Sequence, residues 1–432
     1  MESNLKTTRL LFISLLAVTY CLWNLGSLAR AEQAPDQRMT FGPKYTIDHK
    51  GMHTTGPSAQ LAPDGTLHLT WGGEKQEDRG VFYLQVPPGE ENYPEPMRVS
   101  PPATPVATLH EPPALALGPK NDVYITWTTP HPKANGKLFT SLLLLSRSLD
   151  GGKTFLPPSR VNDDEAVTGH SFDHVTVSPN GSVHVAWLDN REGKKDPATY
   201  SSVSRDQGAT LSPSLKVDEP SCVCCRTFAT TTQDGTVFLT WRKIFQGSIR
   251  ETVVARSIDD GRTFSPAVIV GHDQWVYDGC PHRPATMGVD QQGRLYVAWY
   301  TEGPDDTPGV YFAYSDDQGK SFTPRRQLNM SKGTFPDHPQ LAVNQEGHLL
   351  VTWEEQSPVR REVVFSSSLD RGHTFSAPKK LNEKKSKSPA VAINNQNQAV
   401  IVWMEQVAFP GWSTIIQALA LPNPSTAWAG RQ

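Results

Sequence analysis

The chain has 432 residues, enough for one large repeat domain or two domains of ordinary size. Its formal net charge is only −3 and Lys and Arg form no run, so the composition gives no indication of a nucleic-acid partner. The chain is rich in glycine, proline and tryptophan but only 37% hydrophobic, which favours many short strands joined by turns over a helical fold.

The N-terminal segment predicts export from the cytoplasm. Lys6 and Arg9 precede a largely apolar stretch, residues 10–28, and Ala29-Arg-Ala31 matches an A-x-A cleavage site. We expect residues 1–31 to be a signal peptide; the alternative is an uncleaved membrane anchor, because the apolar stretch is long. No other membrane contact is expected. The mature protein is therefore predicted to be periplasmic or secreted, in an oxidising compartment.

One motif recurs along the chain at intervals of 50 to 60 residues. It consists of an apolar-x-apolar strand, a tight turn, a second alternating strand and a tryptophan, as in Leu61–Trp71. The seven copies end at Trp71, Trp127, Trp187, Trp241, Trp299, Trp353 and Trp403. Six positions before each tryptophan stands Gly or Asn, the residues that adopt positive φ in a hairpin turn: Gly65, Asn121, Gly181, Gly235, Gly293, Gly347 and Asn397.

A second motif, Ser-x-Asp-x-Gly-x-Thr-Phe, follows five of these tryptophans after one further strand. The copies begin at Ser148, Ser257, Ser315 and Ser368, with a weaker copy at Ser204. We interpret this Asp-box as a structural turn rather than a ligand site: the aspartate caps backbone N–H groups, the glycine adopts the strained conformation and the aromatic ring packs between strands.

Repeated four-strand units of fixed length predict an all-β fold, a β-propeller, because a single blade cannot bury its faces without neighbours. Seven blades are favoured and six are the alternative. The last unit lacks a fourth strand, whereas Phe41–Asp48 is similar to the fourth-strand segment Phe375–Asn382. We therefore expect the N-terminal strand to close the ring. The predicted propeller spans residues 32–422, and residues 423–432 form a C-terminal tail.

The repeated Asp-boxes resemble those of the sialidase-like, or BNR-repeat, superfamily, over most of the mature chain. The resemblance implies a propeller and, for a true sialidase, six blades, three substrate-gripping arginines, a Tyr–Glu nucleophile pair and an aspartate acid/base. This chain lacks the Arg-Ile-Pro motif that carries the first arginine. Arg226 and Arg283 could grip an anion, and Tyr277 and Tyr300 are the candidate nucleophiles.

The segments before the first strand of each unit are predicted to lie at one mouth of the channel, on the face opposite the Asp-boxes. His110, His170, Cys224 and His282 stand eleven positions before the turn residue in four consecutive units. Soft and borderline ligands at equivalent positions of successive blades would point toward one axis, which suits copper first and zinc second. The predicted metal ligands are His110, His170, Cys222, Cys224, Cys225, Cys280, His282 and His338.

Other interpretations of these residues remain open. The four mature cysteines are an even number in an oxidising compartment, and Cys222 and Cys280 share an offset in adjacent units, so a disulfide between them is the structural alternative. The histidines could equally be polar residues at the rim of a solvated channel. Glu111, Arg226 and Arg283 are the candidates for binding an anion or substrate. Further carboxylates are expected on the same face, but spacing singles out no catalytic pair: Asp189, Glu192, Asp278, Glu302, Asp305, Glu354 and Glu405.

Three functions therefore follow from the sequence, and it leaves open whether the protein is an enzyme. The first is an extracytoplasmic propeller with a copper site at the channel mouth and a redox or metal-handling role, such as a copper-dependent oxidoreductase. The second is an exo-sialidase or another glycoside hydrolase, and the third is a non-catalytic module that binds a glycan or a protein. The expected partner is a small molecule, a glycan or a redox protein.

Overall fold

The computed structural model describes residues 39–48, 52–75, 78–90, 93–108, 111–304, 307–329, 333–406 and 412–422. The predicted signal peptide and C-terminal tail, together with His110 and Asp305, lie outside these residues. The described residues form one compact unit. All regular elements in the described part are β-strands, and none of its segments is a helix long and apolar enough to cross a membrane.

The described residues form seven sheets, each built on a four-strand antiparallel meander. The first sheet holds β2 (His53–Thr54), β3 (Ser58–Leu61), β4 (Leu67–Lys75), β5 (Asp78–Val86) and β6 (Met97–Arg98). The second holds β7 (Ala114–Leu117), β8 (Val123–Pro130), β9 (Ser141–Ser148) and β10 (Ser159–Arg160). The third holds β11 (His170–Val177), β12 (Val183–Asp189), β13 (Ala198–Ser204) and β14 (Leu215–Asp218).

The remaining sheets repeat this order. The fourth holds β15 (Phe228–Thr231), β16 (Val237–Phe245), β17 (Ile249–Ser257), β18 (Val268–Ile269) and β19 (Trp275–Val276). The fifth holds β20 (Ala285–Val289), β21 (Leu295–Thr301), β22 (Gly309–Ser315) and β23 (Arg326–Gln327). The sixth holds β24 (Phe335–Val343), β25 (Leu349–Gln356), β26 (Arg361–Ser368) and β27 (Lys379–Lys380). The seventh holds β28 (Ser386–Ile393), β29 (Ala399–Gln406), β30 (Trp412–Pro422) and β1 (Met39–Asp48).

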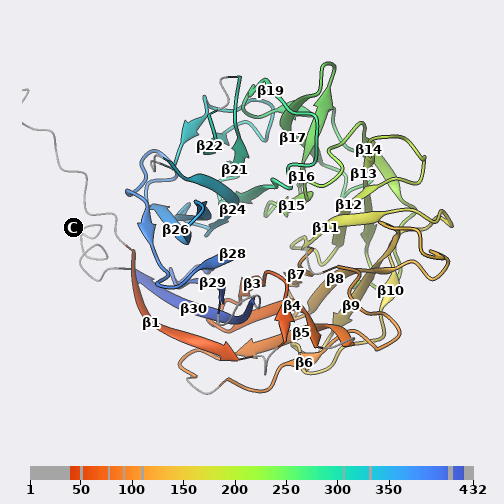
Figure 1. Ribbon diagram of the computed structural model, residues 1–432, viewed down its shortest axis with the longest axis horizontal. Helices are drawn as coiled ribbons and strands as arrows, with labels where there is room; N and C mark the ends of the chain where they lie inside the picture. Colours follow the sequence, from red (N-terminus) through yellow and green to blue (C-terminus); the bar gives the residue numbers. More distant parts are fainter. Residues whose placement is uncertain are drawn as a thin grey trace, which may run out of the picture. The chain divides into compact units, whose positions relative to one another are not determined.

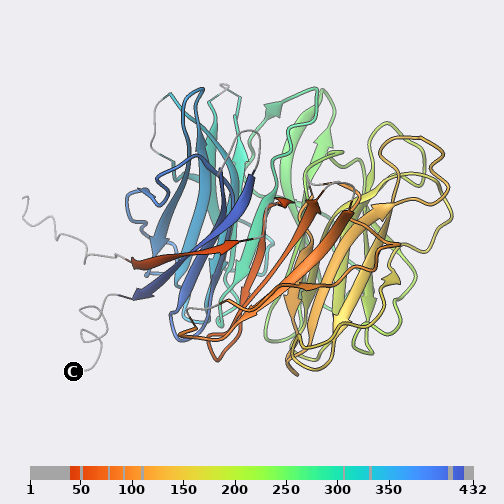
Figure 2. The same ribbon diagram turned by 60° about the horizontal axis from the view of Figure 1, so that its bottom comes forward.

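The innermost strands close a ring. In sequence order β3, β7, β11, β15, β20, β24 and β28 each pack against the next, and β28 packs against β3 (Figure 1). The N-terminal strand β1 pairs antiparallel with β30 from Met39 opposite Pro422 to Asp48 opposite Thr414, at the outer edge of the last sheet (Figure 2). The predicted propeller and its closure by the N-terminal strand are therefore confirmed, and the sheets number seven, one for each repeat.

The hydrophobic core lies between adjacent sheets. The seven motif tryptophans are at most 1% exposed, and each belongs to an apolar cluster shared by neighbouring blades or strands. Trp71 and Leu69 of the first sheet, for example, share a cluster with Val400 and Val402 of the last. Burying such large side chains between blades makes each sheet dependent on its neighbours, which explains why the tryptophan recurs once per unit.

The Asp-boxes form the structural turns that the sequence predicts. In the first copy, Asp150 Oδ1 accepts hydrogen bonds from the Ser148 hydroxyl (2.7 Å) and the Thr154 N–H (2.9 Å), and the Ser148 hydroxyl oxygen accepts one from the Gly152 N–H (2.8 Å). Phe155 then packs edge-on against Tyr83 of the preceding blade, with ring centroids 5.1 Å apart. The residues of the box therefore stabilise their own turn and contact the preceding blade.

Candidate functional site

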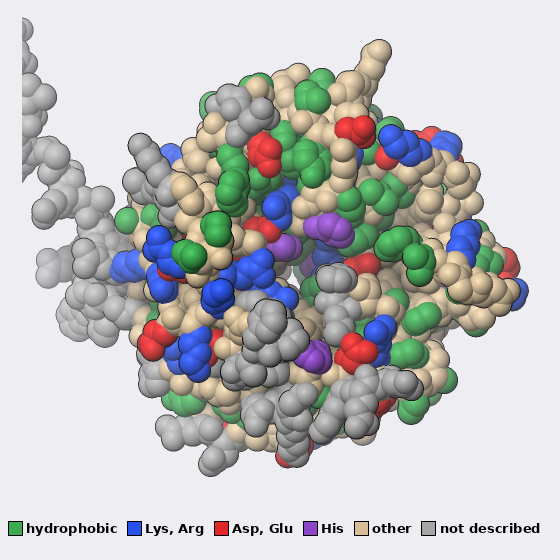
Figure 3. All heavy atoms as spheres, viewed as in Figure 1, with side chains coloured by type: hydrophobic (Ala, Val, Ile, Leu, Met, Phe, Trp, Pro, Cys, Tyr) green, Lys and Arg blue, Asp and Glu red, His purple; other side chains and the backbone are tan. Residues whose placement is uncertain are grey.

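The seven innermost strands line a central cavity of about 610 Å³, whose lining combines alanine, valine and leucine residues with polar ones such as His174 and Arg226. On the face shown in Figure 3, His, Lys and Arg side chains gather around the central opening. Three of the inner strands, β11, β24 and β28, carry a bulge at their first residues. Phe172, His338 and Ser388 adopt positive φ at these bulges. The side chains at the rim therefore no longer alternate regularly between the two faces of the sheet.

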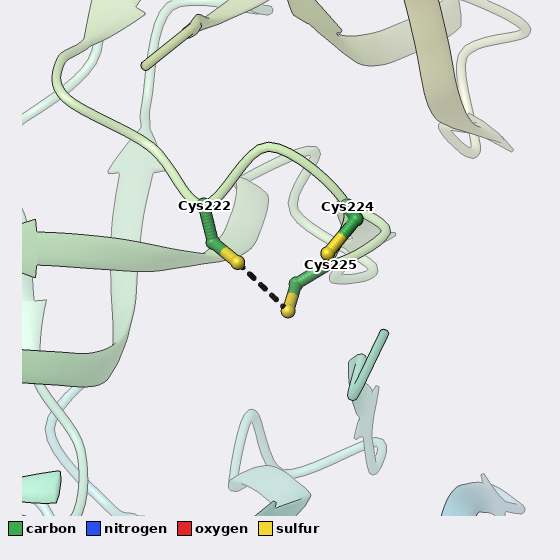
Figure 4. A group of neighbouring side chains, drawn as sticks. All are labelled: Cys222, Cys224 and Cys225. Carbon is green, nitrogen blue, oxygen red and sulfur yellow. Dashed lines mark hydrogen bonds between the residues drawn. The ribbon is translucent and has the colours of Figure 1, made fainter. Parts of the chain in front are cut away.

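Four cysteines lie in two segments that adjoin this cavity: Arg226, next to Cys225, and Pro284, four residues after Cys280, are among its lining residues. The segment Ser221–Thr227 leaves β14 and is held against the edge of β16 by a hydrogen bond of 2.7 Å from the Cys222 N–H to the Arg242 carbonyl. It folds so that the sulfurs of Cys222 and Cys225 lie 3.1 Å apart in a hydrogen bond, with Cys224 beside them (Figure 4). Cys280, from the segment between β19 and β20, is joined to Cys224 by a disulfide.

The disulfide expected as an alternative, between Cys222 and Cys280, is wrong. Cys280 pairs with Cys224, and Cys222 faces Cys225. The shared offset in the repeat misleads here because the two segments approach the mouth differently. The short strand β19 pairs with β17 of the preceding sheet, which draws the segment that follows it over the turn at Cys224.

One histidine completes the cluster. His282 Nε2 lies 3.3 Å from Cys280 Sγ, and the His282 N–H donates to Cys224 Sγ at 3.4 Å. Two groups of potential ligand atoms result, each with all members within 4.8 Å of one another: Cys222, Cys224 and Cys225, and then Cys224, Cys280 and His282. Cys224 belongs to both groups. The first group is buried, whereas Cys280 and His282 are exposed, so the cluster runs from the interior to the surface.

Two buried arginines hold the Cys280 segment in place. The Arg242 guanidinium donates to the carbonyl oxygens of Tyr300 (2.6 Å) and Arg283 (3.2 Å). The Arg250 guanidinium donates to those of Tyr277 (3.0 Å) and Gly279 (3.1 Å). The two arginines are 3% and 4% exposed, and the buried Asp273 carboxylate is near enough to Arg242 for the arginine charge to act on its pKa. The site therefore contains buried positive charge that backbone carbonyls and Asp273 compensate in part.

The positive charge of the two arginines affects the pKa of the Cys222 thiol. The hydrogen bond with Cys225 lowers the pKa of the Cys222 thiol to about 6, and the nearby Arg242 and Arg250 charges act in the same direction. Burial raises the pKa of Cys225 well above the usual value for a thiol. The pair is therefore arranged to carry a single negative charge on Cys222. Neither arginine is predictable from the sequence, because a charged residue inside a strand gives no sign of whether it faces solvent or the interior.

Two predicted ligands lie outside the cysteine cluster. His170 is completely buried; its Nδ1 donates to the Ser141 carbonyl oxygen at 2.7 Å and its Nε2 lies 2.9 Å from Asp164. His338 Nδ1 lies 3.0 Å from Asp337 and 3.4 Å from Glu354. Although burial opposes it, the charge of Asp337 raises the pKa of His338 to about 10. The expectation that these two histidines join the cysteines around one axis is wrong, because each is engaged by carboxylates of its own surroundings.

Residues 190–406, half of the chain, match the family described as the BNR repeat-like domain. The chain belongs to this BNR repeat-like family. No curated protein matches it significantly in sequence.

Solved structures resemble this BNR repeat-like chain in fold. A protein of unknown function from Dyadobacter fermentans is 14% identical with a TM-score of 0.54, covering 89% of this chain and 99% of that one. An ulvan lyase, a polysaccharide lyase, is 10% identical with a TM-score of 0.56, covering 87% and 95%. The polysaccharide lyase Uly1 is 11% identical with a TM-score of 0.55, covering 91% and 95%. At these identities the likeness concerns the fold alone.

The BNR repeat-like propeller does not bring its candidate anion-binding arginines to one ligand. Arg226 donates to the Pro112 carbonyl at 2.5 Å and lies 3.9 Å from Asp173. Arg283 pairs with Asp337 instead, and its guanidinium lies 4.8 Å from the centre of the Tyr300 ring. Each guanidinium is thus engaged by a different carboxylate, and the described contacts form no common cradle for an anion.

The remaining candidates for hydrolysis have structural partners as well. The Tyr300 hydroxyl donates to Glu302 at 2.7 Å, a Tyr–Glu pair, but Tyr300 is only 1% exposed and burial raises the pKa of its hydroxyl. Glu111 accepts a hydrogen bond of 3.0 Å from the Phe172 N–H, and burial raises the pKa of its carboxyl to about 7. The pair at Tyr300 is therefore shielded from solvent in this structure.

Proposed function

We propose that this BNR repeat-like propeller is an extracytoplasmic metal-handling or redox protein that binds a soft metal ion, copper(I) first and zinc second, at its channel mouth. The ligands are Cys222, Cys224, Cys225, Cys280 and His282. The observation that carries the proposal is their arrangement: four sulfurs and one imidazole from two separate segments form two ligand groups that share Cys224.

The donor set favours copper(I). Thiolates are soft ligands that select copper(I), and imidazole suits both copper and zinc. Binding requires the reduced form, in which Cys224 and Cys280 are thiolates rather than a disulfide. When bound, copper would supply a one-electron couple, while the protein fixes its ligands and shields it from water.

The buried arginines support an anionic ligand set. Two or more thiolates around a monovalent cation carry net negative charge, which would be unfavourable in an apolar interior without compensation. Arg242 and Arg250 place positive charge beside Cys222 and donate to carbonyl oxygens of the Cys280 segment. They therefore serve as positioning residues that hold the second half of the site against the first.

The exposure of the ligands supports exchange of the ion with the surroundings. Cys280 and His282 face solvent, whereas Cys222, Cys224 and Cys225 are buried. An ion would be received at the exposed side and retained by the buried thiolates. The export signal expected at residues 1–31 would place this exchange outside the cytoplasm.

The test is an anaerobic titration of the reduced protein with copper(I) in competition with a chromogenic copper(I) chelator. We expect one tightly bound copper per chain, with affinity lowered at least tenfold in His282→Gln. His338→Gln is the matched control, because His338 also lies at the mouth but outside the cluster. Equal affinity in the two variants, or no binding by the reduced wild type, would contradict the proposal.

A further inference from the structure

The four cysteines of the cluster form two pairs in different oxidation states. Cys224 and Cys280 are joined by a disulfide, while Cys222 and Cys225 remain thiols with their sulfurs 3.1 Å apart. We propose that the metal-free cluster is a thiol–disulfide exchange site in which the buried Cys222/Cys225 dithiol and the Cys224–Cys280 disulfide exchange two electrons. This activity uses the same residues as the proposed copper site but does not require a metal.

The distances allow direct exchange. The Cys222, Cys224 and Cys225 sulfurs all lie within 4.8 Å of one another, so either thiol sulfur is close to one sulfur of the disulfide. All three are held in one turn of the chain, anchored by the Cys222 N–H bond to Arg242 and by the Thr227 N–H bond of 3.0 Å to the Phe172 carbonyl. The reacting sulfurs are thus positioned before the reaction begins.

The exchange balances without an outside oxidant. The Cys222 thiolate attacks Cys224 Sγ, a Cys222–Cys224 bond forms, and Cys280 leaves as a thiolate. Cys225, which is buried, then attacks Cys222 Sγ, and its proton passes to the departing sulfur of Cys224, which leaves as a thiol. Cys224 and Cys280 take up the two protons that the first pair gave up. The product is a Cys222–Cys225 disulfide with Cys224 and Cys280 as thiols, and the number of electrons on the chain is unchanged.

His282 assists the leaving sulfur. Its Nε2 lies 3.3 Å from Cys280 Sγ, so an imidazole N–H at that nitrogen can stabilise the departing thiolate by a hydrogen bond. Its backbone N–H contacts the other sulfur of the disulfide, Cys224, at 3.4 Å. Thus a single residue contacts both sulfurs of the bond that breaks.

The exposure of the four cysteines determines which of them an external thiol or disulfide can reach. Cys280 is exposed, whereas Cys222, Cys224 and Cys225 are 0%, 3% and 1% exposed. An external thiol or disulfide, either a small molecule or an exposed cysteine pair of another exported protein, meets Cys280 first. The buried pair then exchanges electrons with the outside only through Cys224 and Cys280.

The test uses the reduced full-length mature protein, kept anaerobic with a metal chelator and given one molar equivalent of oxidised glutathione. Samples are quenched with acid, alkylated and digested with trypsin. The Cys224–Cys280 bond links peptide 217–226 to peptide 263–294, whereas the Cys222–Cys225 bond lies within peptide 217–226. We expect the cross-linked pair to form first and the internal bond to grow at its expense, with two thiols per chain once the oxidised glutathione has been consumed. A cross-link that persists unchanged, with Cys222 and Cys225 alkylated at all times, would overturn the proposal.

A variant tests the route. In the double variant Cys224→Ser/Cys280→Ser, checked for folding by its melting temperature, we expect the Cys222–Cys225 bond to form at least tenfold more slowly with oxidised glutathione. Formation at the wild-type rate would show direct access to the buried pair and overturn the relay. Copper(I) affinity, measured separately on the reduced protein, distinguishes failure of this proposal from failure of the metal site.

Discussion

The Arg250 guanidinium donates a hydrogen bond of 3.1 Å to the carbonyl oxygen of Gly279, the residue immediately before Cys280. Together with its bond to the Tyr277 carbonyl, this contact fixes a segment that has little regular structure of its own. The position of Cys280 beside Cys224 therefore depends on a buried charge on β17, the strand that pairs with β19.

Replacing Arg250 by methionine tests this dependence. The Tyr277 and Gly279 carbonyls lose their donors, so we expect the free energy of unfolding to fall by about 2 kcal/mol. Copper(I) affinity should fall as well, because the two halves of the site are no longer held together. Denaturant unfolding and chelator competition measure the two effects. Arg205→Met is the control: that side chain pairs at the surface with Asp260, so a change below about 1 kcal/mol is expected. Equal losses in both variants would contradict the positioning role.

The close approach of blades at the Asp-boxes predicts a second effect. A Cβ at Gly152 would collide with the Tyr83 side chain, and its φ is +87°. Gly181 has a similar φ of +88°, but a Cβ there meets nothing within 4 Å. Gly181→Ala should therefore be destabilised by about 1 kcal/mol, from backbone strain alone, and Gly152→Ala by about 2 kcal/mol more. Thermal unfolding of the two variants measures the difference, and equal melting temperatures would argue against tight packing at the box.

Because the Glu111 carboxyl is buried, we expect the free energy of unfolding to depend on pH. Burial raises the pKa of its carboxyl in the folded state to about 7, above the ordinary value of 4.5. The folded state therefore binds this proton more tightly than the unfolded state does. Its contribution is fully present below pH 4.5 and is lost as the pH rises through 7, by up to about 3 kcal/mol. Glu111→Gln keeps an acceptor for the Phe172 N–H, so the variant should be more stable than wild type at pH 8 and should lose this dependence. Parallel unfolding curves for the two proteins between pH 5 and pH 8 would refute the assignment.

The sequence predicts the scaffold well because the scaffold is periodic. Each unit carries its own turn residue and tryptophan, and five of the seven carry an Asp-box, so Gly65 and Trp71 identify a blade without knowledge of the others. Closure by Phe41–Asp48 follows from the missing fourth strand. These features are local, and their repetition allows them to be recognised in the sequence.

The site is less predictable because it depends on side-chain directions and on contacts between units. Equal offsets place His170 and Cys224 in equivalent positions, but the bulge in β11 and the Asp164 carboxylate direct His170 elsewhere. The pairing of Cys280 with Cys224 depends on β19, a two-residue strand with no distinct pattern. The buried Arg242 and Arg250 follow from tertiary structure alone.

The most direct test of the central claim is X-ray absorption at the copper edge of the reduced protein loaded with one equivalent of copper(I). We expect a first coordination shell dominated by sulfur, with one nitrogen shell that disappears in His282→Gln and remains in His338→Gln. A shell of nitrogen and oxygen without sulfur would contradict it.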